Sequence, residues 1–228
     1  MGVACLIPAK MTSVRLPGKN LIDLCGKPLL YYSIRAAQLT NNIDEVYVSS
    51  EDNRVLNAAT LFGATPILRP AELSMPHVPN IEVLRHFYDH LQQKPKEVIL
   101  LQPTHPLRHP TDLEKAINLF INSAADCLLS VIEVNGLLNE IDNRTNQLKG
   151  KSKNKTLMSK MYKNTGSFYI FRPKKTFITE TFFGKNIITY ILKRPDLEVD
   201  IDTEYDLKLA RCLLNTYKNE FHFFFEKS

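Results

Sequence analysis

The stretch VACLIPAKMTSVRLPGKN, residues 3–20, joins a short apolar run to a loop rich in cations. The apolar part, residues 3–9, has the length and composition of a buried strand. The loop that follows carries Lys10, Arg15 and Lys19 among small and turn-forming residues. Backbone N–H groups in a turn, together with several cations, are what a polyphosphate requires; a basic surface loop is the alternative. The order GxxxxGK followed by Ser or Thr is absent, so this is not a Walker loop.

Beyond this loop, apolar runs of strand length alternate with helical patterns. The predicted elements are strand 3–9, helix 27–39, strand 45–50, helix 51–63, strand 65–70, helix 80–93, strand 97–103, helix 111–123 and strand 127–134. Asn80 is expected to cap one helix, and Thr111 with Glu114 to form a capping box on another. This alternation predicts an α/β fold, with a mostly parallel twisted sheet and helices on both faces in three α/β/α layers.

Three polar loops leave the carboxyl ends of predicted strands. They are the loop 10–20, the segment RPAEL at 69–73 and the segment PTHPLR at 103–108. Ligands of open α/β sheets bind at the carboxyl ends of the strands. We therefore expect the three loops to converge on one binding site.

A carboxylate pair occurs near the C-terminus, in VDIDTEYD at 199–206. In a strand, Asp200 and Asp202 would point to the same side, and two like charges so close require a cation or a shared proton. Mg²⁺ takes one or two carboxylates together with phosphate oxygens. The alternative is that Asp202 and Thr203 merely begin a helix, with Thr203 as its cap. A cationic loop and a carboxylate pair on one sheet predict a metal-dependent reaction on a nucleoside triphosphate.

Composition narrows the choice of partners. The chain has 228 residues and a net charge of +5, with its basic residues spread out, which favours a small anionic ligand over nucleic acid. No segment approaches the roughly 20 apolar residues of a membrane helix, and the N-terminus does not resemble a signal peptide. The four cysteines are far apart and fit no metal spacing, which is typical of reduced thiols in a cytoplasmic protein.

The regular pattern fails from about residue 135 to residue 163. Residues 149–163 form a lysine-rich run without an acidic residue, which is either a solvated excursion or a basic flap over an anionic substrate. Residues 1–228 are expected to form a single domain, with 135–165 and about 180–188 as insertion or dimerisation elements.

Seven motifs together resemble the acylneuraminate cytidylyltransferases, the CMP–sialic acid synthetases, including relatives that activate legionaminic or pseudaminic acid. The motifs, in order along nearly the whole chain, are IPAK-x-x-S-x-R-LPGKN, GKPLLYYSI, VSSED, GATPILRPAEL, LLQPTHPLR, NTGSFYIF and DIDTEYDLKLA. The resemblance implies a Rossmann-like nucleotidyltransferase fold with a small dimerisation insertion, and a homodimer. It also implies the reaction, in which the anomeric hydroxyl of a nine-carbon 2-keto sugar acid attacks the α-phosphate of CTP and pyrophosphate leaves.

The resemblance assigns roles residue by residue. It implies that CTP is bound by Pro8, Ala9, Lys10, Ser13, Arg15, Lys19, Asn20, Arg69 and Asn80. Among these, Lys19 and Ser13 would hold triphosphate oxygens, and Arg69 would reach the cytosine. Asn20 would bind ribose or phosphate.

The same resemblance implies a sugar site and a metal site. The sugar would be bound by Gln102, His105, Arg108, Lys155, Lys163, Phe182 and Phe183. Asp200 and Asp202 would hold Mg²⁺ and, with Lys19, form the catalytic set, one of the carboxylates being able to receive the hydroxyl proton. The two phenylalanines resemble a pair that reaches from the dimer partner, and ordinary core residues are the alternative.

Several residues depart from the family pattern. Lys10 stands where the family usually has Arg, which removes the guanidinium fork but leaves a charge. Asn80 replaces a serine near the base, and Lys155 and Lys163 align with arginines. His105 replaces a serine beside the sugar pocket, although a surface histidine is the alternative. We hypothesise that the sugar acid is not ordinary N-acetylneuraminate.

Two other functions remain possible at this point. One is a cytidylyltransferase for the eight-carbon acid 3-deoxy-manno-octulosonate, whose family has a loop like RLPGK that Arg15 fits well. The other is a non-catalytic nucleotide-binding relative that has kept the fold, which the changes at Lys10 and residues 76–80 permit. The polar set Lys19, Gln102, Asp200 and Asp202 argues against it.

Overall fold

The computed structural model of the chain describes residues 2–13, 15–134, 140–141, 148–149, 161–179 and 183–226. The strands are β1 Val3–Pro8, β2 Asp23–Leu24, β3 Lys27–Pro28, β4 Glu45–Ser50, β5 Thr65–Leu68, β6 Glu97–Leu101, β7 Cys127–Val134, β8 Glu140–Ile141, β9 Leu148–Lys149, β10 Met161–Phe171 and β11 Ile187–Ile191. The helices are α1 Leu29–Gln38, α2 Asn53–Leu61, α3 Asn80–His90, α4 Pro110–Ile121, α5 Pro173–Thr179 and α6 Glu204–Thr216. Short 3₁₀ helices are η1 Lys19–Leu21, η2 Ala71–Ser74, η3 Pro195–Leu197 and η4 His222–Phe224.

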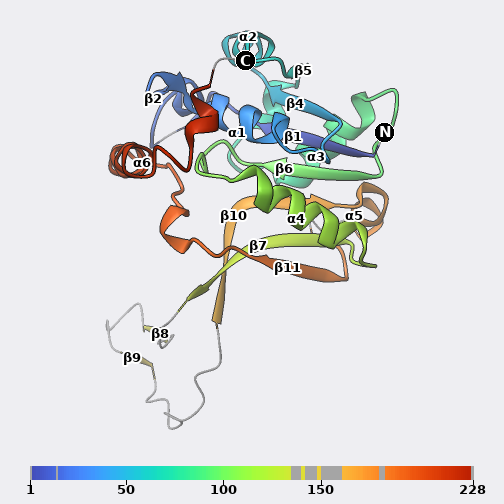
Figure 1. Cartoon of the computed structure of the whole chain (residues 1–228). Helices are drawn as coiled ribbons and strands as arrows, with labels where there is room; N and C mark the ends of the chain where they lie inside the picture. The colour runs from blue at the N-terminus through green and yellow to red at the C-terminus, as the bar shows by residue number, and fades with distance from the viewer. Residues whose placement is uncertain are drawn as a thin grey trace.

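A seven-stranded sheet in the order β11-β7-β10-β6-β1-β4-β5 forms the centre of the molecule (Figure 1). β1 runs parallel to β4 and β6, β4 runs parallel to β5, and β11 runs parallel to β7. β10 is antiparallel to both of its neighbours, β6 and β7. The prediction of a mostly parallel sheet is therefore confirmed.

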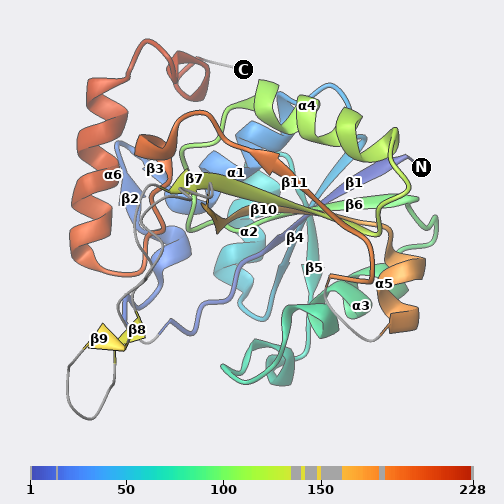
Figure 2. The same cartoon turned by 90° about the horizontal axis from the view of Figure 1, so that it is seen from below.

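Helices cover both faces of this sheet (Figure 2). Along β1, Val3, Cys5 and Ile7 lie in the core shared with α1, α2, α4 and α6, whereas Ala4 and Leu6 lie in the core shared with α3. Successive side chains of a strand point to opposite faces, so a continuous apolar run such as β1 is buried on both sides. The three α/β/α layers follow from this double burial.

The predicted cap of α3 and the predicted capping box of α4 are both wrong, because a proline determines where each helix begins. α3 begins at Asn80 itself, after the extended Pro79, and no side chain caps it. α4 begins at Pro110 after His109, since proline suits the first helical position. Thr111 consequently lies inside the first turn, where its Oγ1 is 2.8 Å from His109 Nδ1.

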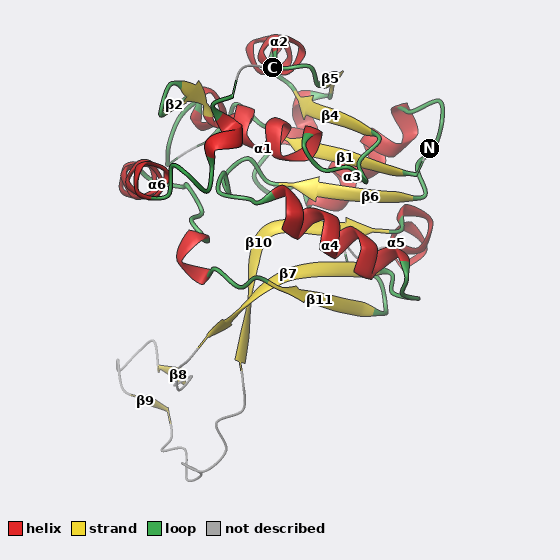
Figure 3. Ribbon diagram, in the orientation of Figure 1, coloured by secondary structure: helices red, strands yellow, loops and turns green. Residues whose placement is uncertain are grey.

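β7 and β10 form a two-stranded arm that extends beyond the other strands (Figure 3). Their pairing is regular from Met161, opposite Val134, to Asn164 and is then interrupted before Tyr169. Gly166 lies in this interruption with φ +77°, a conformation that favours glycine.

The predicted insertion elements fall partly outside the described residues. Most of 135–165 lies outside them, and residues 161–165 belong to β10. Within 180–188 the structure describes residues from Phe183 onward, and residues 187–188 begin β11. The dimerisation role of both segments stays a prediction.

The cysteines occur as free thiols, with Cys5 and Cys127 buried and Cys212 exposed. Burial raises the pKa of both buried thiols, which makes them inert. No helix in the described part of the chain combines the length and the apolar character needed to cross a membrane.

Candidate active site

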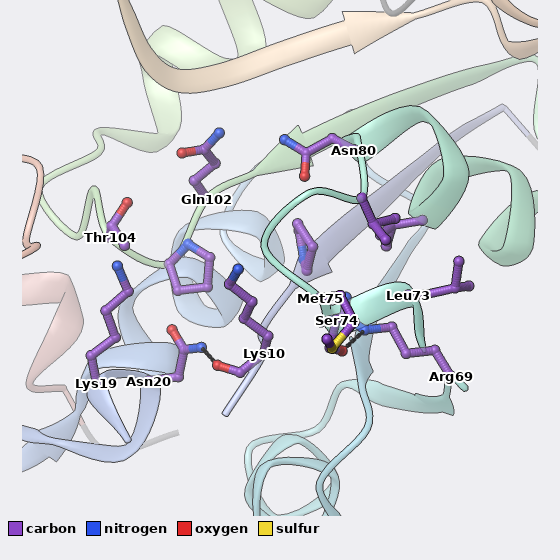
Figure 4. A pocket seen from close by; sticks show the side chains of 14 residues that line it. Lys10, Lys19, Asn20, Arg69, Leu73, Ser74, Met75, Asn80, Gln102 and Thr104 are labelled. Carbon is purple, nitrogen blue, oxygen red and sulfur yellow. Dashed lines mark hydrogen bonds between the residues drawn. The ribbon is translucent and has the colours of Figure 1, made fainter. Parts of the chain in front are cut away.

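A cavity of about 200 Å³ opens at the carboxyl edge of the sheet, where β1, β5 and β6 end (Figure 4). The predicted residues in its wall are Pro8, Lys10, Lys19, Asn20, Arg69, Asn80 and Gln102. The remaining wall residues, to which no individual role was assigned from the sequence, are Leu73, Ser74, Met75, Val78, Val83, Pro103 and Thr104. The predicted convergence of three loops is therefore confirmed.

The opening loop is shaped by a glycine and a buried amide. Gly18, with φ +67°, precedes η1, and a Cβ there would lie 3.1 Å from Met11 Cε. Asn20 is 3% exposed, and its Nδ2 donates to the Lys10 carbonyl at 2.8 Å. Its buried Oδ1 has no hydrogen-bond partner among the described residues, and the residue lines the cavity. Asn20 therefore holds the loop in place and still has an acceptor for a ligand hydroxyl.

The loop after β1 and a segment near the C-terminus meet at Asp202. Lys19 Nζ lies 2.7 Å from Asp202 Oδ1, and Arg15 contacts the other carboxylate oxygen. The Ile201 N–H donates to the Thr104 carbonyl at 2.8 Å, which attaches this segment to the loop after β6. A cationic loop and an acidic segment that are remote in sequence thus form one site.

Asp200 belongs to the same segment and has a different neighbour. Its Oδ1 lies 3.8 Å from His105 Nδ1, and burial, with a smaller contribution from Asp202, raises its pKa although a hydrogen bond from Thr104 opposes this. The expectation that the pair lies in a strand is wrong, because the segment between η3 and α6 is irregular. The predicted Thr203 cap is confirmed: Thr203 and Asp206 form a capping box at the start of α6.

The carboxylate pair fits a hard divalent cation such as Mg²⁺. Oxygen is the donor that Mg²⁺ prefers, and a cation would relieve the repulsion that helps to raise the Asp200 pKa. The described residues contain no cluster of three or more metal-binding side chains. Mg²⁺ does not require one, since it retains waters and binds substrate phosphates.

His105 is 4% exposed, so the surface alternative is wrong. Burial, reinforced by the Arg108 charge, lowers its pKa to about 3, and the imidazole is therefore neutral at physiological pH. Its Nδ1 lies 3.2 Å from Thr104 Oγ1, and a Cβ on Gly166 would be 3.5 Å from its Cε1. Gly166 therefore lies close to the His105 ring and to Gln102.

Arg108 is buried behind the loop after β6 and is not in the wall of the cavity. Its guanidinium donates to the Ser167 carbonyl at 2.8 Å, to Ser33 Oγ at 2.8 Å and to the Gln102 carbonyl. These bonds show that Arg108 supports Gln102 from behind. Burial raises the pKa of the nearby Glu198 to about 7 despite the Arg108 charge, and no sequence motif marks this carboxyl.

A second buried network lies at the other end of the cavity. Arg69, with a side chain only 2% exposed, donates from Nη2 to Glu51 Oε2 at 3.2 Å and from Nε to Ser74 Oγ at 2.9 Å. Glu51 occurs in the quoted motif VSSED, but no local pattern assigns it a partner.

The remaining predicted residues lie away from the cavity wall or outside the described residues. Ala9 is buried and donates to the Ser49 carbonyl at 2.9 Å, and Ser13 is partly exposed on the opening loop. Lys163 is exposed on the arm, opposite Ile132. Phe183 packs in the core beside Tyr169, with ring centroids 6.1 Å apart, as the core alternative expected. The predictions for Lys155 and Phe182 lie outside the described residues.

Three named enzymes are similar to this chain over more than 90% of its length. A pseudaminic acid cytidylyltransferase of Campylobacter jejuni is 33% identical over 222 residues, which is 92% of this chain and 94% of that protein. A CMP-N,N'-diacetyllegionaminic acid synthase of Legionella pneumophila is 29% identical and covers 94% of this chain and 97% of that protein. An N-acylneuraminate cytidylyltransferase of Escherichia coli is 28% identical over 91% of this chain and 51% of that protein.

Solved structures share the fold at low identity. A CMP:2-keto-3-deoxy-manno-octonic acid synthetase complexed with CTP matches 95% of this chain and 99% of that chain, with a TM-score of 0.73 and 19% identity. A 4-diphosphocytidyl-2C-methyl-D-erythritol synthase from Anaerococcus prevotii matches 94% and 98%, with a TM-score of 0.67 and 11% identity. These likenesses establish the nucleotidyltransferase fold. A family model described as cytidylyltransferase matches residues 4–227, and the chain therefore belongs to the cytidylyltransferase family.

Proposed function

We propose that the chain transfers CMP from CTP to the anomeric hydroxyl of a nine-carbon 2-keto sugar acid and releases pyrophosphate. The observation that carries this proposal is the contact between Lys19 and Asp202 beside the cavity at the carboxyl edge of the sheet. Nucleotidyl transfer mainly requires positioning and charge neutralisation, and this contact brings cations and carboxylates to one place. The relatives that act on pseudaminic, legionaminic and N-acylneuraminic acids support the substrate class.

The nucleotide occupies the cavity between the opening loop and the segment after β5. Lys10 and Lys19 hold triphosphate oxygens as point charges, since both line the cavity (Figure 4). Asn20 Oδ1 accepts a hydrogen bond from a ribose hydroxyl. Arg69 faces the cytosine end, where a guanidinium can donate to the acceptors of the base.

The sugar acid lies beside Gln102, His105 and Gly166. Its anomeric oxygen attacks the α-phosphorus, the bond from that phosphorus to the bridging oxygen breaks, and pyrophosphate leaves with the electron pair. Asp200, which lies 3.8 Å from His105 on the side of the sugar, takes the hydroxyl proton as a general base. His105 stays neutral and supports this side of the site through its contacts with Thr104 and the Thr165 backbone.

Asp200 and Asp202 would hold Mg²⁺, which supplies charge neutralisation at the phosphates when bound. Lys19 and Arg15 pair with Asp202 in the structure, so a triphosphate that attracts both cations would leave this carboxylate available to the metal. Binding of nucleotide and binding of metal are coupled through this one side chain.

Release of pyrophosphate from CTP, with and without Mg²⁺, tests the enzyme assignment. We expect release only when CTP, Mg²⁺ and a suitable sugar acid are all present. ATP, GTP and UTP should give at least tenfold lower rates, about 1.4 kcal/mol of discrimination. No release with any sugar acid would support the non-catalytic nucleotide-binding alternative.

The choice of sugar acid requires a second assay. Pseudaminic, legionaminic, N-acetylneuraminic and 3-deoxy-manno-octulosonic acids should be compared by kcat/KM with CTP. We propose a preference for a sugar acid other than N-acetylneuraminate, supported by His105 and by the pseudaminic acid relative. A clear preference for N-acetylneuraminate would contradict this, and a preference for the eight-carbon acid would favour the octulosonate alternative.

We also propose a cytoplasmic homodimer. The free thiols are consistent with a reducing compartment, and the arm formed by β7 and β10 offers an exposed surface at Tyr162. Light scattering at micromolar concentration should give twice the mass of the chain. A monomer under those conditions would contradict the dimer.

A further inference from the structure

Glu51 connects the two ends of the nucleotide cavity. It follows β4 directly, between the strand ends from which the opening loop and the Arg69 segment leave the sheet. Its Oε1 accepts from the Met11 N–H at 2.8 Å. Its Oε2 accepts from Ser74 Oγ at 2.5 Å and from Arg69 Nη2 at 3.2 Å. One Glu51 oxygen therefore holds the loop after β1, and the other holds the segment after β5. These two segments form different walls of the cavity.

The opposite charges of Glu51 and Arg69 lie in a network that is largely removed from solvent. The Glu51 side chain is 12% exposed and that of Arg69 is 2% exposed, so each charge compensates the other in a largely buried pair. Although burial acts to raise the pKa of Glu51, hydrogen bonds from Ser74 and Met11 and the Arg69 charge bring it below the ordinary value. Glu51 is thus an anion at every pH at which the protein would work.

We propose that Glu51 is a positioning residue that sets base specificity by fixing the Arg69 guanidinium while it holds the opening loop. This inference rests on the proposed function and extends it to Glu51, to which the sequence motifs assign no role. A guanidinium has only donors; cytosine presents acceptors at O2 and N3, whereas uracil carries a hydrogen at N3. A rigidly held Arg69 therefore favours cytosine over uracil. Without Glu51 the Arg69 guanidinium can turn away from the base, and the protein would then discriminate less between the two bases.

Binding of CTP and of UTP to Glu51→Gln, measured by calorimetry without a sugar acid, tests the proposal. The amide keeps the shape but loses the charge, and its single oxygen cannot serve both walls. We expect CTP affinity to fall about tenfold and UTP affinity to change much less, so the CTP:UTP ratio falls. Glu45→Gln, the same change at the exposed start of β4, is the matched control and should leave the ratio unchanged.

A double-mutant cycle separates positioning from general damage. In an Arg69→Gln background, Glu51→Gln should change the CTP:UTP ratio by less than about twofold, because its partner is already absent. Additive effects on the ratio would overturn the proposal. A folded Glu51→Gln protein with the wild-type ratio would also overturn it.

A milder variant decides the question if Glu51→Gln does not fold. Ser74→Ala removes the hydroxyl that joins Glu51 to Arg69, and a fall of about threefold in the ratio is expected. An unchanged ratio in this variant overturns the proposal. Wild-type protein that binds no nucleotide would instead refute the proposed function, so the two failures are distinguishable.

Discussion

Lys19 Nζ lies 2.7 Å from Asp202 Oδ1, although 183 positions separate the two residues in the chain. The pair joins the loop after β1 to the segment before α6, on one edge of the sheet. A chain whose basic and acidic motifs lay on opposite sides could not bring a triphosphate and a metal together. Their contact is the reason to expect catalysis rather than fold alone.

Asp202→Asn should abolish turnover while the protein stays folded. The amide keeps the size of the side chain and can still accept from Lys19, but it removes the charge that would hold the metal. We expect pyrophosphate release to fall at least about a hundredfold. Glu204→Gln, an exposed neighbour, is the control. Equal turnover in Asp202→Asn would mean that the metal site is misplaced.

Lys19→Ala should weaken CTP binding about tenfold to a hundredfold, because a charge-assisted contact to phosphate is lost in a partly buried site. Calorimetry on the protein without sugar acid measures this directly. Lys115→Ala, which removes an exposed lysine of α4, should bind CTP normally. If both variants bind equally well, Lys19 does not belong to the phosphate site.

Removal of divalent cations with a chelator should stop pyrophosphate release, and added Mg²⁺ should restore it. The reason is that Asp200 and Asp202 repel each other and the triphosphate unless a cation lies between them. CTP should also strengthen Mg²⁺ binding, since its phosphates compete with Asp202 for Lys19 and Arg15. Turnover that persists in excess chelator would refute a metal-dependent mechanism.

His105 should make the protein less stable in acid. Its folded pKa of about 3 lies below the ordinary histidine value, so between pH 6.5 and pH 3 the unfolded chain binds a proton that the folded protein does not. Stability is therefore complete above pH 6.5 and falls as the pH drops, by up to about 1.4 kcal/mol per pH unit. Urea unfolding of wild type and His105→Asn over this range tests it; identical slopes would mean that His105 titrates normally.

The mostly parallel sheet and the meeting of the three loops could be predicted because both follow from local patterns and a rule of topology. The continuous apolar run of β1 indicates that this strand is buried on both faces. Parallel strands have their carboxyl ends on the same edge of the sheet, which brings the loops together. The expectation that a strand aligns Asp200 and Asp202 was wrong, and their role as metal ligands stays a prediction. The bond between the Ile201 N–H and the Thr104 carbonyl places this segment beside the loop after β6, and no sequence spacing reveals that bond.

Side chains whose partners are distant in sequence could not be predicted. Glu51 finds Met11 on one side and Arg69 on the other, and nothing in VSSED indicates either contact. The family resemblance implied that Arg108 binds the sugar, yet in the structure its buried guanidinium donates to backbone carbonyls and Ser33. Burial is decided by the whole fold, so a short motif cannot show which polar groups face inward.

The reversed direction of β10 has a consequence for how this scaffold can vary. β7 ends at Val134 and β10 begins at Met161 directly opposite, so both strands meet their connection at one end of the sheet. A change in the length of that connection would leave the links among β1, β4, β5 and β6 unaltered. A protein engineer could therefore insert sequence between β7 and β10 without rebuilding the parallel half of the sheet.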